Sequence, residues 1–444
     1  MNIKSAFFAA FRFLGISRNS FQQHFCTSAS VENSRKSLVG AIVGIAISLV
    51  PLLVVQVVID GMISGITGRI IELSSYHAQL IDFGNYEDPE FYISEAERLE
   101  EFENIVSAVP EKNGFVIAVG REGRLGGTLR AVEGSFFEDK AVKKYMYPVE
   151  GSLGFSSSRS ILVGKEFSEK CGVKTGDTVR IFSMKKNSRG ILVPKITPFI
   201  VSGVFSSGYQ ELDGLWFFVP FETGYSVLDN DSSRTLIGIK TQNPYKNISS
   251  IVQFLRLESK SGFSTYSWQE LNRSQFYSFQ TTRMLLIFIM MLILLVASVN
   301  ISSALVMMIL ERRKEIAILK STGASPGYIS FVFILIGLFA GISGALIGIP
   351  VGVICALNVN NLIKIIEFVL NSFFKFINLF NGTGEYIPLR LLDPAYYLEE
   401  IPVHISIENL ILIFTGTVIL SFLVSIVPGI KAGKEKPLEI LRKF

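Results

Sequence analysis

The sequence predicts an integral membrane protein of four transmembrane α-helices with a large α+β domain on one side of the membrane. The chain of 444 residues is 49% hydrophobic and only 18% charged, which is too apolar for an ordinary soluble protein. Uncharged, largely apolar runs occupy residues 37–59, 284–310, 321–363 and 409–430. Each contains the roughly 20 residues that a transmembrane helix needs. Buried helices of soluble proteins rarely contain uncharged runs of this length, so we predict four spans.

These runs divide the chain into segments. We expect an N-terminal segment (1–36), a first span (37–60), an outer domain (61–283), a second span (284–310), a short charged helix and turn (311–325), a third span (326–357), an outer loop (358–406), a fourth span (407–430) and a tail (431–444). Arg12 interrupts the apolar part of "MNIKSAFFAAFRFLGIS", so an amphipathic helix on the membrane surface is favoured over a signal peptide.

The distribution of Lys and Arg predicts the orientation. The N-terminal segment has five, the turn at 311–320 has four and the tail has five. The segment 358–406 has only three, against five acidic residues. Because loops rich in Lys and Arg stay on the cytoplasmic side, we expect both termini and the charged turn to be cytoplasmic.

The segment between the first two spans mixes helical and strand patterns. Apolar residues at helical spacing predict a helix over 94–109, with Ser94 as its N-cap. Further helices are expected over 221–228 and 244–259, and strands over 114–120, 196–205, 215–220 and 234–240. The segment 161–182 is expected to form a strand, a helix and a second strand in that order. Residues 183–195 form a basic loop between two strands, for which a solvated hairpin loop is the simpler interpretation. Cys171 is expected to be a small buried residue.

No motif for chemistry is present. The chain has no phosphate-binding loop of the G-x-x-x-x-G-K-[ST] type, and no G-x-S-x-G or H-E-x-x-H motif. His24, His77 and His404 lie in different topological zones, so we expect no metal site. No ionisable residue lies in the middle of a span, which argues against a carrier driven by an ion gradient. We therefore expect a subunit that is not an enzyme and takes its energy from a partner.

Two features of the spans have a structural interpretation. Glycines 337, 341, 344, 348 and 352 form one stripe along the third span, which favours close helix packing. Asn300 in the second span is also more simply a packing residue than a coupling site. Between these spans, Gly323 is expected to end a short helix, and Ser325 to cap the next helix with Pro326 in its first turn. Such a rigid turn can transmit a push from a partner, although an ordinary cytoplasmic loop is an equal alternative.

The stretch "NISSALVMMILERRKEIAILKSTGASPGYISFVFILIGLFAGISGALIG" resembles the ABC permeases that include FtsX, macrolide exporters of the MacB type and lipoprotein-releasing permeases. The resemblance implies that the charged turn is a coupling helix, which sits in a groove of a separate ATPase. That ATPase would bind ATP and Mg, and this chain would bind no cofactor. The implied coupling residues are Glu311, Arg312, Arg313, Lys314, Glu315, Ile316, Leu319 and Gly323.

The rest of the chain resembles the lipoprotein-releasing branch. The matching stretches include "FFAAFRFLGISRNSFQQHF", "ILVGKEFSEKCGVKTGDTVRI" and "DPAYYLEEIPVHIS". The resemblance implies a MacB-like core in the outer domain and a dimeric permease, homo- or heterodimeric, in a bacterial inner membrane. It would extract acylated lipoproteins and pass them to a periplasmic carrier, without nucleic acid. Acyl chains would meet Ile59, Met62, Ile66, Leu285, Phe288 and Leu292, although ordinary contact with membrane lipids is an equal alternative for each.

In the same family, a hairpin of one subunit type hooks the carrier. The corresponding residues here are Lys185, Arg189, Val193, Pro194 and Pro198, and whether this chain is the carrier-binding or the lipoprotein-binding subunit stays open. An amphipathic helix is expected around "IIEFVLNSFFKFINLF" in the outer loop. Two alternatives stand beside lipoprotein release: a MacB-like mechanotransmission or efflux permease, and an FtsX-like regulator of a cell-wall hydrolase.

Overall fold

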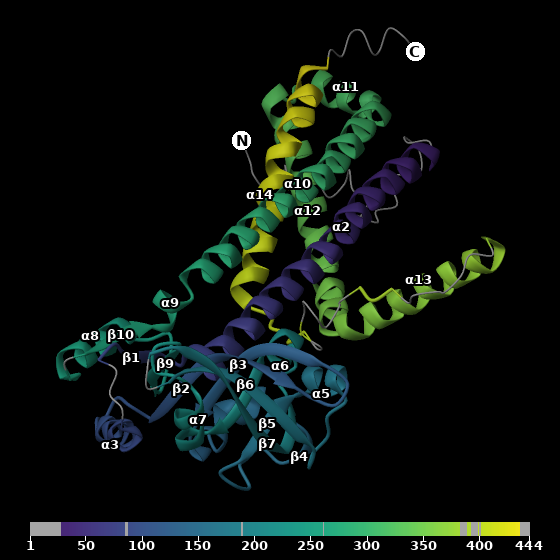
Figure 1. The fold of residues 1–444 in the computed structure, drawn as a ribbon. Coiled ribbons are helices and arrows are strands. Elements are labelled where there is room, and N and C mark those ends of the chain that lie inside the picture. The colour runs from purple at the N-terminus through teal and green to yellow at the C-terminus, as the bar shows by residue number, and fades with distance from the viewer. Residues whose placement is uncertain are drawn as a thin grey trace. The chain divides into compact units, whose positions relative to one another are not determined.

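The computed structural model describes residues 28–84, 88–187, 190–260, 262–381, 389–391, 398 and 401–435. The chain divides into two compact units (Figure 1). The membrane unit comprises the described residues of Met1–Gly61, Thr281–Phe368 and Val403–Phe444, and the outer domain those of Met62–Gln280 and Val369–Pro402. The amphipathic helix expected at the N-terminus lies outside the described residues.

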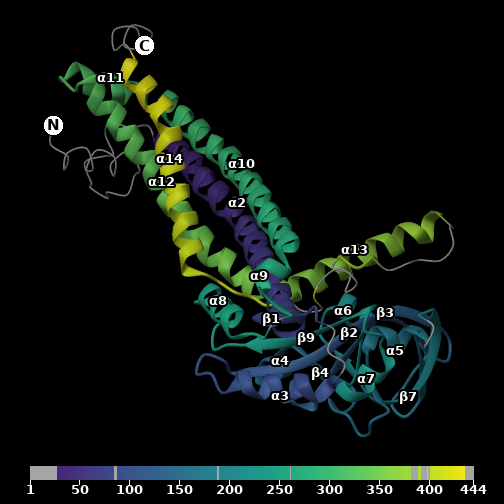
Figure 2. The same cartoon turned by 60° about the vertical axis from the view of Figure 1, so that its left-hand side comes forward.

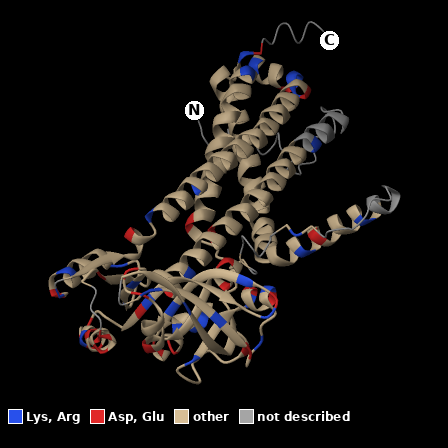
Figure 3. Cartoon of the chain, viewed as in Figure 1, with Lys and Arg blue, Asp and Glu red and all other residues tan. Residues whose placement is uncertain are grey.

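Four helices of the described chain are long and apolar enough to cross a membrane, as the sequence predicts. They are α2 (Ser28–Arg69), α10 (Arg273–Glu311), α12 (Pro326–Leu357) and α14 (Ile407–Lys434). Two shorter helices, α11 (Arg313–Ser321) and α13 (Val359–Asn381), follow α10 and α12. Within the membrane unit, α2 runs beside α10, and α12 beside α14 (Figure 2). Charged residues gather at its α11 end (Figure 3).

The glycine stripe of α12 is a packing surface, as expected. A Cβ added to Gly344 would lie 2.8 Å from Ile45 Cβ, and one added to Gly348 would lie 2.9 Å from the Cα of Ala46, both on α2. On its other side the stripe meets α14, where a Cβ on Gly341 would overlap Ser421. The hydroxyl of Ser421 donates to the carbonyl of Thr417 at 2.7 Å, so this small polar side chain is satisfied within its own helix. Small residues thus let α12 pack closely against both neighbours.

We expect Gly348→Ala to destabilise the membrane unit by about 1–3 kcal/mol, because the added methyl group meets backbone atoms of α2 that cannot rotate away. Gly416→Ala in α14 is the matched control, since an added Cβ there meets nothing within 4 Å. It should be neutral or slightly stabilising because alanine favours helix. Thermal unfolding of both variants in the same detergent tests this, and equal midpoints would contradict it.

The outer domain is built on one mixed sheet. Its strands are β1 (Ala78–Asp82), β2 (Ser107–Val119), β3 (Arg124–Val132), β4 (Tyr147–Gly151), β5 (Ser160–Gly164), β6 (Thr178–Lys186), β7 (Leu192–Ser206), β8 (Trp216–Pro220), β9 (Ser233–Lys240) and β10 (Phe263–Ser267). They pair in the order β10-β1-β9-β2-β3-β8-β5-β7-β4. β6 pairs with both β2 and β7, so the part from β2 to β7 closes on itself.

Apolar side chains fill this closed part of the sheet. Val116, Leu129, Phe199 and Phe217 are at most 1% exposed and belong to one buried cluster, together with Cys171, which is buried as expected. The helices around the sheet are η2 (Ile70–Ser75, a π-helix), α3 (Pro89–Glu100), η3 (Gly134–Phe137, a 3-10 helix), α4 (Lys140–Tyr145), α5 (Lys165–Cys171), α6 (Gln210–Leu215), α7 (Phe221–Val227), α8 (Ile248–Glu258) and α9 (Trp268–Leu271).

The helix expected over 94–109 is confirmed over 94–100, but its bounds are wrong. Helix α3 begins earlier, where the carboxylate of Asp88 accepts a hydrogen bond from the backbone N–H of Glu90 and Pro89 occupies the first turn. It ends at Glu100, and β2 begins at Ser107. The apolar residues at 105–109 fit a strand as well as a helix, and pairing with β9 decides for the strand. The loop expected over 183–195 does connect two strands of a hairpin, but it is shorter than expected, because β6 and β7 stay paired up to Lys186 and Leu192.

Candidate functional site

The charged segment after α10 forms a helix with one buried side. Ile316 and Ala317 of α11 are 0% exposed and face the core of the membrane unit. Gly323 has φ +97°, a conformation that suits glycine, and ends the turn after α11. The hydroxyl of Ser325 then accepts from the backbone N–H of Tyr328 at 3.2 Å, which caps α12. Both local expectations from the sequence are confirmed.

Polar contacts fix α11 to the end of α14. The ammonium group of Lys320 donates to the carbonyl of Gly433 at 2.6 Å and to that of Glu435. Arg313 Nη2 lies 2.9 Å from Glu435 Oε1. Positive groups at the last carbonyls of a helix interact favourably with its dipole. These contacts attach α11 to the end of α14, in addition to its chain connections with α10 and α12.

The outward side of α11 presents both charge and apolar area. Lys314, Ile318 and Thr322 are exposed and recur at four-residue spacing, so they share one face of the segment. Ile318 is 52% exposed, although it is a large apolar residue beside lysine. Ile318 and Thr322 were not among the coupling residues expected from the sequence, and their four-residue spacing from Lys314 is the signal that identifies them.

The eight residues proposed for coupling fall into three groups. Arg312 and Ile316 are buried, and the guanidinium of Arg312 contacts Glu315 at 2.9 Å. These two hold the helix in place and do not face outward. Half-buried positions are Glu311, Glu315 and Leu319, and exposed positions are Arg313, Lys314 and Gly323.

The residues proposed for the acyl wall also differ in exposure. On α10, Leu285 and Phe288 are both 58% exposed and Leu292 is 46% exposed, and they lie at helical spacing on one side. On α2, Ile59 and Met62 are half-buried. Ile66 is buried within the outer domain in a cluster with Ile70 and Leu398, so this chain's own side chains cover it.

A polar cluster joins three helices at the end of the membrane unit opposite α11. The carboxylate of Asp60 on α2 accepts from the side-chain amides of Gln56 at 2.9 Å and of Asn409 at 2.8 Å. Arg283 of α10 lies 3.6 Å from the same carboxylate. This cluster links α2, α10 and α14 where the spans end.

Side-chain hydrogen bonds fix the loop end of the β6–β7 hairpin to the chain at 226–227. Ser183 Oγ donates to the carbonyl of Val227 at 3.0 Å, and the ammonium groups of Lys185 and Lys195 both donate to the carbonyl of Ser226. Lys185 is thus engaged within the domain. Val193, which pairs with Lys185, and Pro194 are exposed, as is Pro198 farther along β7. Arg189 lies outside the described residues.

A buried lysine lies close enough to Lys185 to feel its charge. Lys112 is 0% exposed, and its ammonium group donates to Asn230 Oδ1 and lies 3.7 Å from the centroid of the Tyr225 ring. Burial, reinforced by the positive charge of Lys185, lowers the pKa of Lys112 to about 8, although Asp229 acts in the opposite direction. In the unfolded chain the group titrates near its ordinary pKa, which is about 10.4.

Between these two pKa values the unfolded chain binds more protons, so the stability that Lys112 contributes rises with pH. We expect the unfolding free energy of the natural protein, relative to Lys112→Met, to increase by about 1–2 kcal/mol from pH 7 to pH 9.5. Tyr76 and Cys171 have raised pKa values and act in the opposite direction, but both proteins share them. Urea unfolding followed by tryptophan fluorescence measures the outer domain, and a constant difference across this range would contradict the expectation.

A buried ion pair fixes η2, the turn that follows α2, to the sheet. Arg130 of β3 and Glu111 of β2 are 3% and 1% exposed, and their side chains make two hydrogen bonds of 2.7 Å. Arg130 also donates to the carbonyl of Leu73 in η2, and Tyr76 OH donates to Glu111 at 2.7 Å. Burial alone lowers the pKa of Arg130, but the charge and hydrogen bonds of Glu111 outweigh burial and leave this pKa raised.

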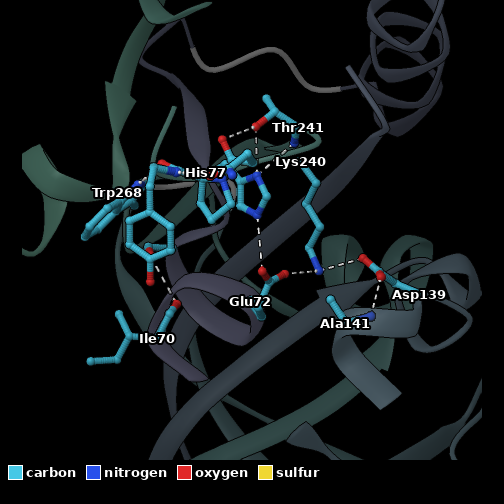
Figure 4. Close-up of polar contacts among 12 residues, drawn as sticks. Ile70, Glu72, His77, Asp139, Ala141, Lys240, Thr241 and Trp268 are labelled. Atoms are coloured by element: carbon cyan, nitrogen blue, oxygen red, sulfur yellow. Dashed lines mark hydrogen bonds and ion pairs between the residues drawn. The ribbon is translucent and has the colours of Figure 1, made fainter. Parts of the chain in front are cut away.

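A second polar group lies beside η2 (Figure 4). Glu72 contacts Lys240 of β9 at 3.2 Å, and Lys240 contacts Asp139 at 2.6 Å. His77 Nδ1 accepts from the backbone N–H of Thr241 at 2.8 Å, which places the proton of a neutral ring on Nε2, 3.3 Å from Glu72. Together, the contacts of Arg130 and Lys240 hold η2 against the sheet. Among the residues that the structure describes, no group of His, Cys, Asp and Glu is placed to hold a metal ion.

Two family models match the chain. Residues 38–250 match the MacB-like periplasmic core domain, and residues 287–437 match the FtsX-like permease C-terminal region. The lipoprotein-releasing system transmembrane protein LolC of Neisseria meningitidis serogroup B is 23% identical over 90% of this chain and 93% of its own length. LolE of Haemophilus influenzae is 22% identical over 90% of this chain and 92% of its own length. The chain is a LolC/LolE-type permease of the FtsX family.

Other similarities are more limited in extent. LolC of Xylella fastidiosa strain 9a5c is 25% identical, and the match covers 64% of this permease and 64% of that relative. The crystal structure of the periplasmic region of MacB from Actinobacillus actinomycetemcomitans is 17% identical over 46% of this chain and 94% of that chain, with a TM-score of 0.30. The two family models and the four apolar helices make the permease a multi-pass membrane protein with a MacB-like periplasmic domain, and its relatives are permease subunits of ABC transporters.

Proposed function

We propose that this permease extracts lipoproteins from the bacterial inner membrane for transfer to a periplasmic carrier, driven by a separate ATPase. The observation that carries the proposal is the match over nine-tenths of the chain to relatives named as lipoprotein-releasing proteins. Three surfaces of the chain suit the three steps: α11 for the ATPase, the exposed apolar residues of α10 for acyl chains, and the β6–β7 hairpin for the carrier.

Exposed apolar residues of α10 suit an acylated cargo. Leu285, Phe288 and Leu292 offer an apolar wall, and burying an acyl chain is worth about 0.8 kcal/mol for each CH₂ group. A wall of this kind retains the acyl chain without a polar site. Ile59 and Met62 would extend it on α2. Ile66 is the weakest candidate for this wall, since Leu398 and Ile70 already cover it.

The ATPase would dock on the exposed face of α11. In this proposal both termini and α11 are cytoplasmic, in line with the concentration of Lys and Arg there. ATP and Mg would be bound by the ATPase, and this chain would supply no catalytic group. A second permease subunit, identical or related, would complete the dimer.

The carrier would meet the β6–β7 hairpin. Val193 is 38% exposed, and its neighbours Ile191 and Leu192 are 58% and 48% exposed, so the hairpin presents apolar side chains beside lysines. The contacts of Ser183, Lys185 and Lys195 fix this hairpin close to its turn, which reduces the ordering cost of binding. Pro194 and Pro198 would contribute to the same surface.

Mass spectrometry of the proteins that co-purify with the permease in mild detergent without ATP tests the proposal. We expect an ABC ATPase together with acylated lipoproteins. An ATPase accompanied by an envelope adaptor or a cell-wall hydrolase, without acylated cargo, would instead support the MacB-like or FtsX-like alternative. Replacing Leu285 and Phe288 with serine should reduce the recovered lipoproteins but not the ATPase.

A further inference from the structure

Helix α13 starts where the third spanning helix ends. Only Asn358 separates α12 from α13, and its side-chain amide donates to the carbonyl of Ile354 at 3.0 Å. The backbone N–H of Leu362 then donates to the carbonyl of Asn358 at 2.9 Å, so the chain passes directly from one helix into the next. Helix α2 leads into the outer domain and α10 leads out of it, so α11 lies on the opposite side of the membrane from that domain. Helix α12 crosses the membrane again and therefore ends on the side of the outer domain. The start of α13 is thus held at the bilayer boundary on that side.

The two sides of α13 differ sharply in chemistry. Successive helical residues turn by about 100°, which places Lys364, Asn371 and Lys375 on one side. The opposite side carries Ile366, Val369, Leu370 and Phe373, flanked by further isoleucine and phenylalanine residues. Phe368 is the exception, since it lies on the lysine side. A single acidic residue, Glu367, accompanies the two lysines between Val359 and Phe376.

The described chain leaves the apolar side of α13 exposed. Ile366 is 48% exposed, Val369 57% and Phe373 57%. The polar side, by contrast, meets the returning chain: the side-chain amide of Asn371 donates to the carbonyl of Leu389 at 3.0 Å, and its carbonyl oxygen accepts from the N–H of the same residue at 2.8 Å. The chain therefore contacts the polar side of α13, and the apolar side points away from this contact. An apolar surface of this extent is unfavourable in water.

We propose that α13 lies in the membrane interface, on the leaflet facing the outer domain, with its apolar side among the acyl chains. The occupant of the exposed side is phospholipid, because the helix is anchored at the bilayer boundary by α12 and its two lysines lie opposite the inserted side, at the level of the phosphate groups. The helix is thus a lipid-binding element in addition to the four spans. This inference does not depend on the proposed release of lipoproteins.

Labels on opposite sides of the helix test the proposal. The full-length protein carries Cys26→Ser and Cys355→Ser and retains Cys171, which is 1% exposed and therefore poorly reactive. Single cysteines are introduced as Ile366→Cys and Phe373→Cys, with Lys364→Cys and Lys375→Cys as matched controls two residues away. Each is labelled with an environment-sensitive fluorophore and reconstituted into vesicles of phosphatidylethanolamine and phosphatidylglycerol. Some of these lipids carry nitroxide groups on their acyl chains.

We expect the nitroxide lipids to quench the labels at 366 and 373 by roughly twofold or more, to similar extents, and to quench the two control labels much less. Quenching at 366 alone would mean that the helix leaves the membrane, and would overturn the proposal. Equal quenching on both sides would overturn the interfacial orientation. Labels at 366 and 373 that are shielded from water but not quenched by lipid would show that a protein, such as a second copy of the chain, covers this side.

Discussion

Arg130→Met should lower the unfolding free energy of the outer domain by about 3–5 kcal/mol, the largest effect that we expect from a single substitution. The replacement leaves the carboxylate of Glu111 buried at 1% exposure without its cation. It also removes a donor from the carbonyl of Leu73, which becomes a buried acceptor that has lost its charged partner. Burial of an unpaired charge is far more costly than loss of an exposed ion pair.

The measurement is urea unfolding of the full-length protein in detergent, followed by tryptophan fluorescence. Both tryptophans, Trp216 and Trp268, lie in the outer domain, so the signal comes from that unit. Arg130 lies 4.5 Å from the Trp216 ring, so circular dichroism should be recorded as a second probe that does not depend on this contact. The control is Arg121→Met, because Arg121 is 72% exposed and its contact with Asp177 is 3.5 Å long. That control should cost less than about 1 kcal/mol.

A double substitution separates the charge from the packing. Changing both Arg130 and Glu111 to Met removes the unpaired charge, and we expect it to recover about half or more of the loss. Full recovery is not expected, because Tyr76 OH and the carbonyl of Leu73 lose their partners. A cost for Arg130→Met no greater than that for Arg121→Met would show that the buried pair does not hold η2 on the sheet.

The sequence alone predicted the parts of the fold that depend on local pattern. The four spans follow from apolar runs that only a membrane or an unusually large core accommodates, and their helices appear where expected. Gly323 and Ser325 were identified correctly because turn and capping chemistry acts within three or four residues. The packing role of the glycine stripe followed from its helical spacing in the same way.

The features that were missed depend on contacts between distant residues. Arg130 and Glu111 are ordinary charged residues in the sequence, and only the pairing of β2 with β3 makes them a buried pair. The end of α3 was misplaced because the apolar pattern of residues 105–109 fits a helix as well as a strand. Only the pairing of β2 with β9 shows that these residues belong to a strand. Likewise, the sequence could not show that Ile316 is buried while Ile318, two residues later, is 52% exposed. Such assignments require the tertiary structure.

The exposed face of α11 is where we expect the largest functional effect. Lys314→Glu combined with Ile318→Asp replaces a cation and an apolar side chain with carboxylates on the face that would enter the ATPase. If the proposed docking is correct, the loss of affinity should be about 2 kcal/mol or more, which is roughly thirtyfold in Kd. The fold should persist, because both residues are exposed and α11 is held by Ile316, Ala317 and the contacts of Lys320.

The control pair is Lys143→Glu with Leu257→Asp, which makes the same changes of chemistry at exposed positions of α4 and α8 in the outer domain. Affinity for the purified ATPase and its stimulated ATP hydrolysis are measured in reconstituted vesicles for both pairs. A loss confined to the α11 pair would mean that Lys314 and Ile318 are contacts with the partner, while Arg312 and Ile316 serve to hold the helix. Equal affinities for the two pairs would exclude this face of α11 as the docking site, because reversing its chemistry would then have no more effect than the same changes in the outer domain.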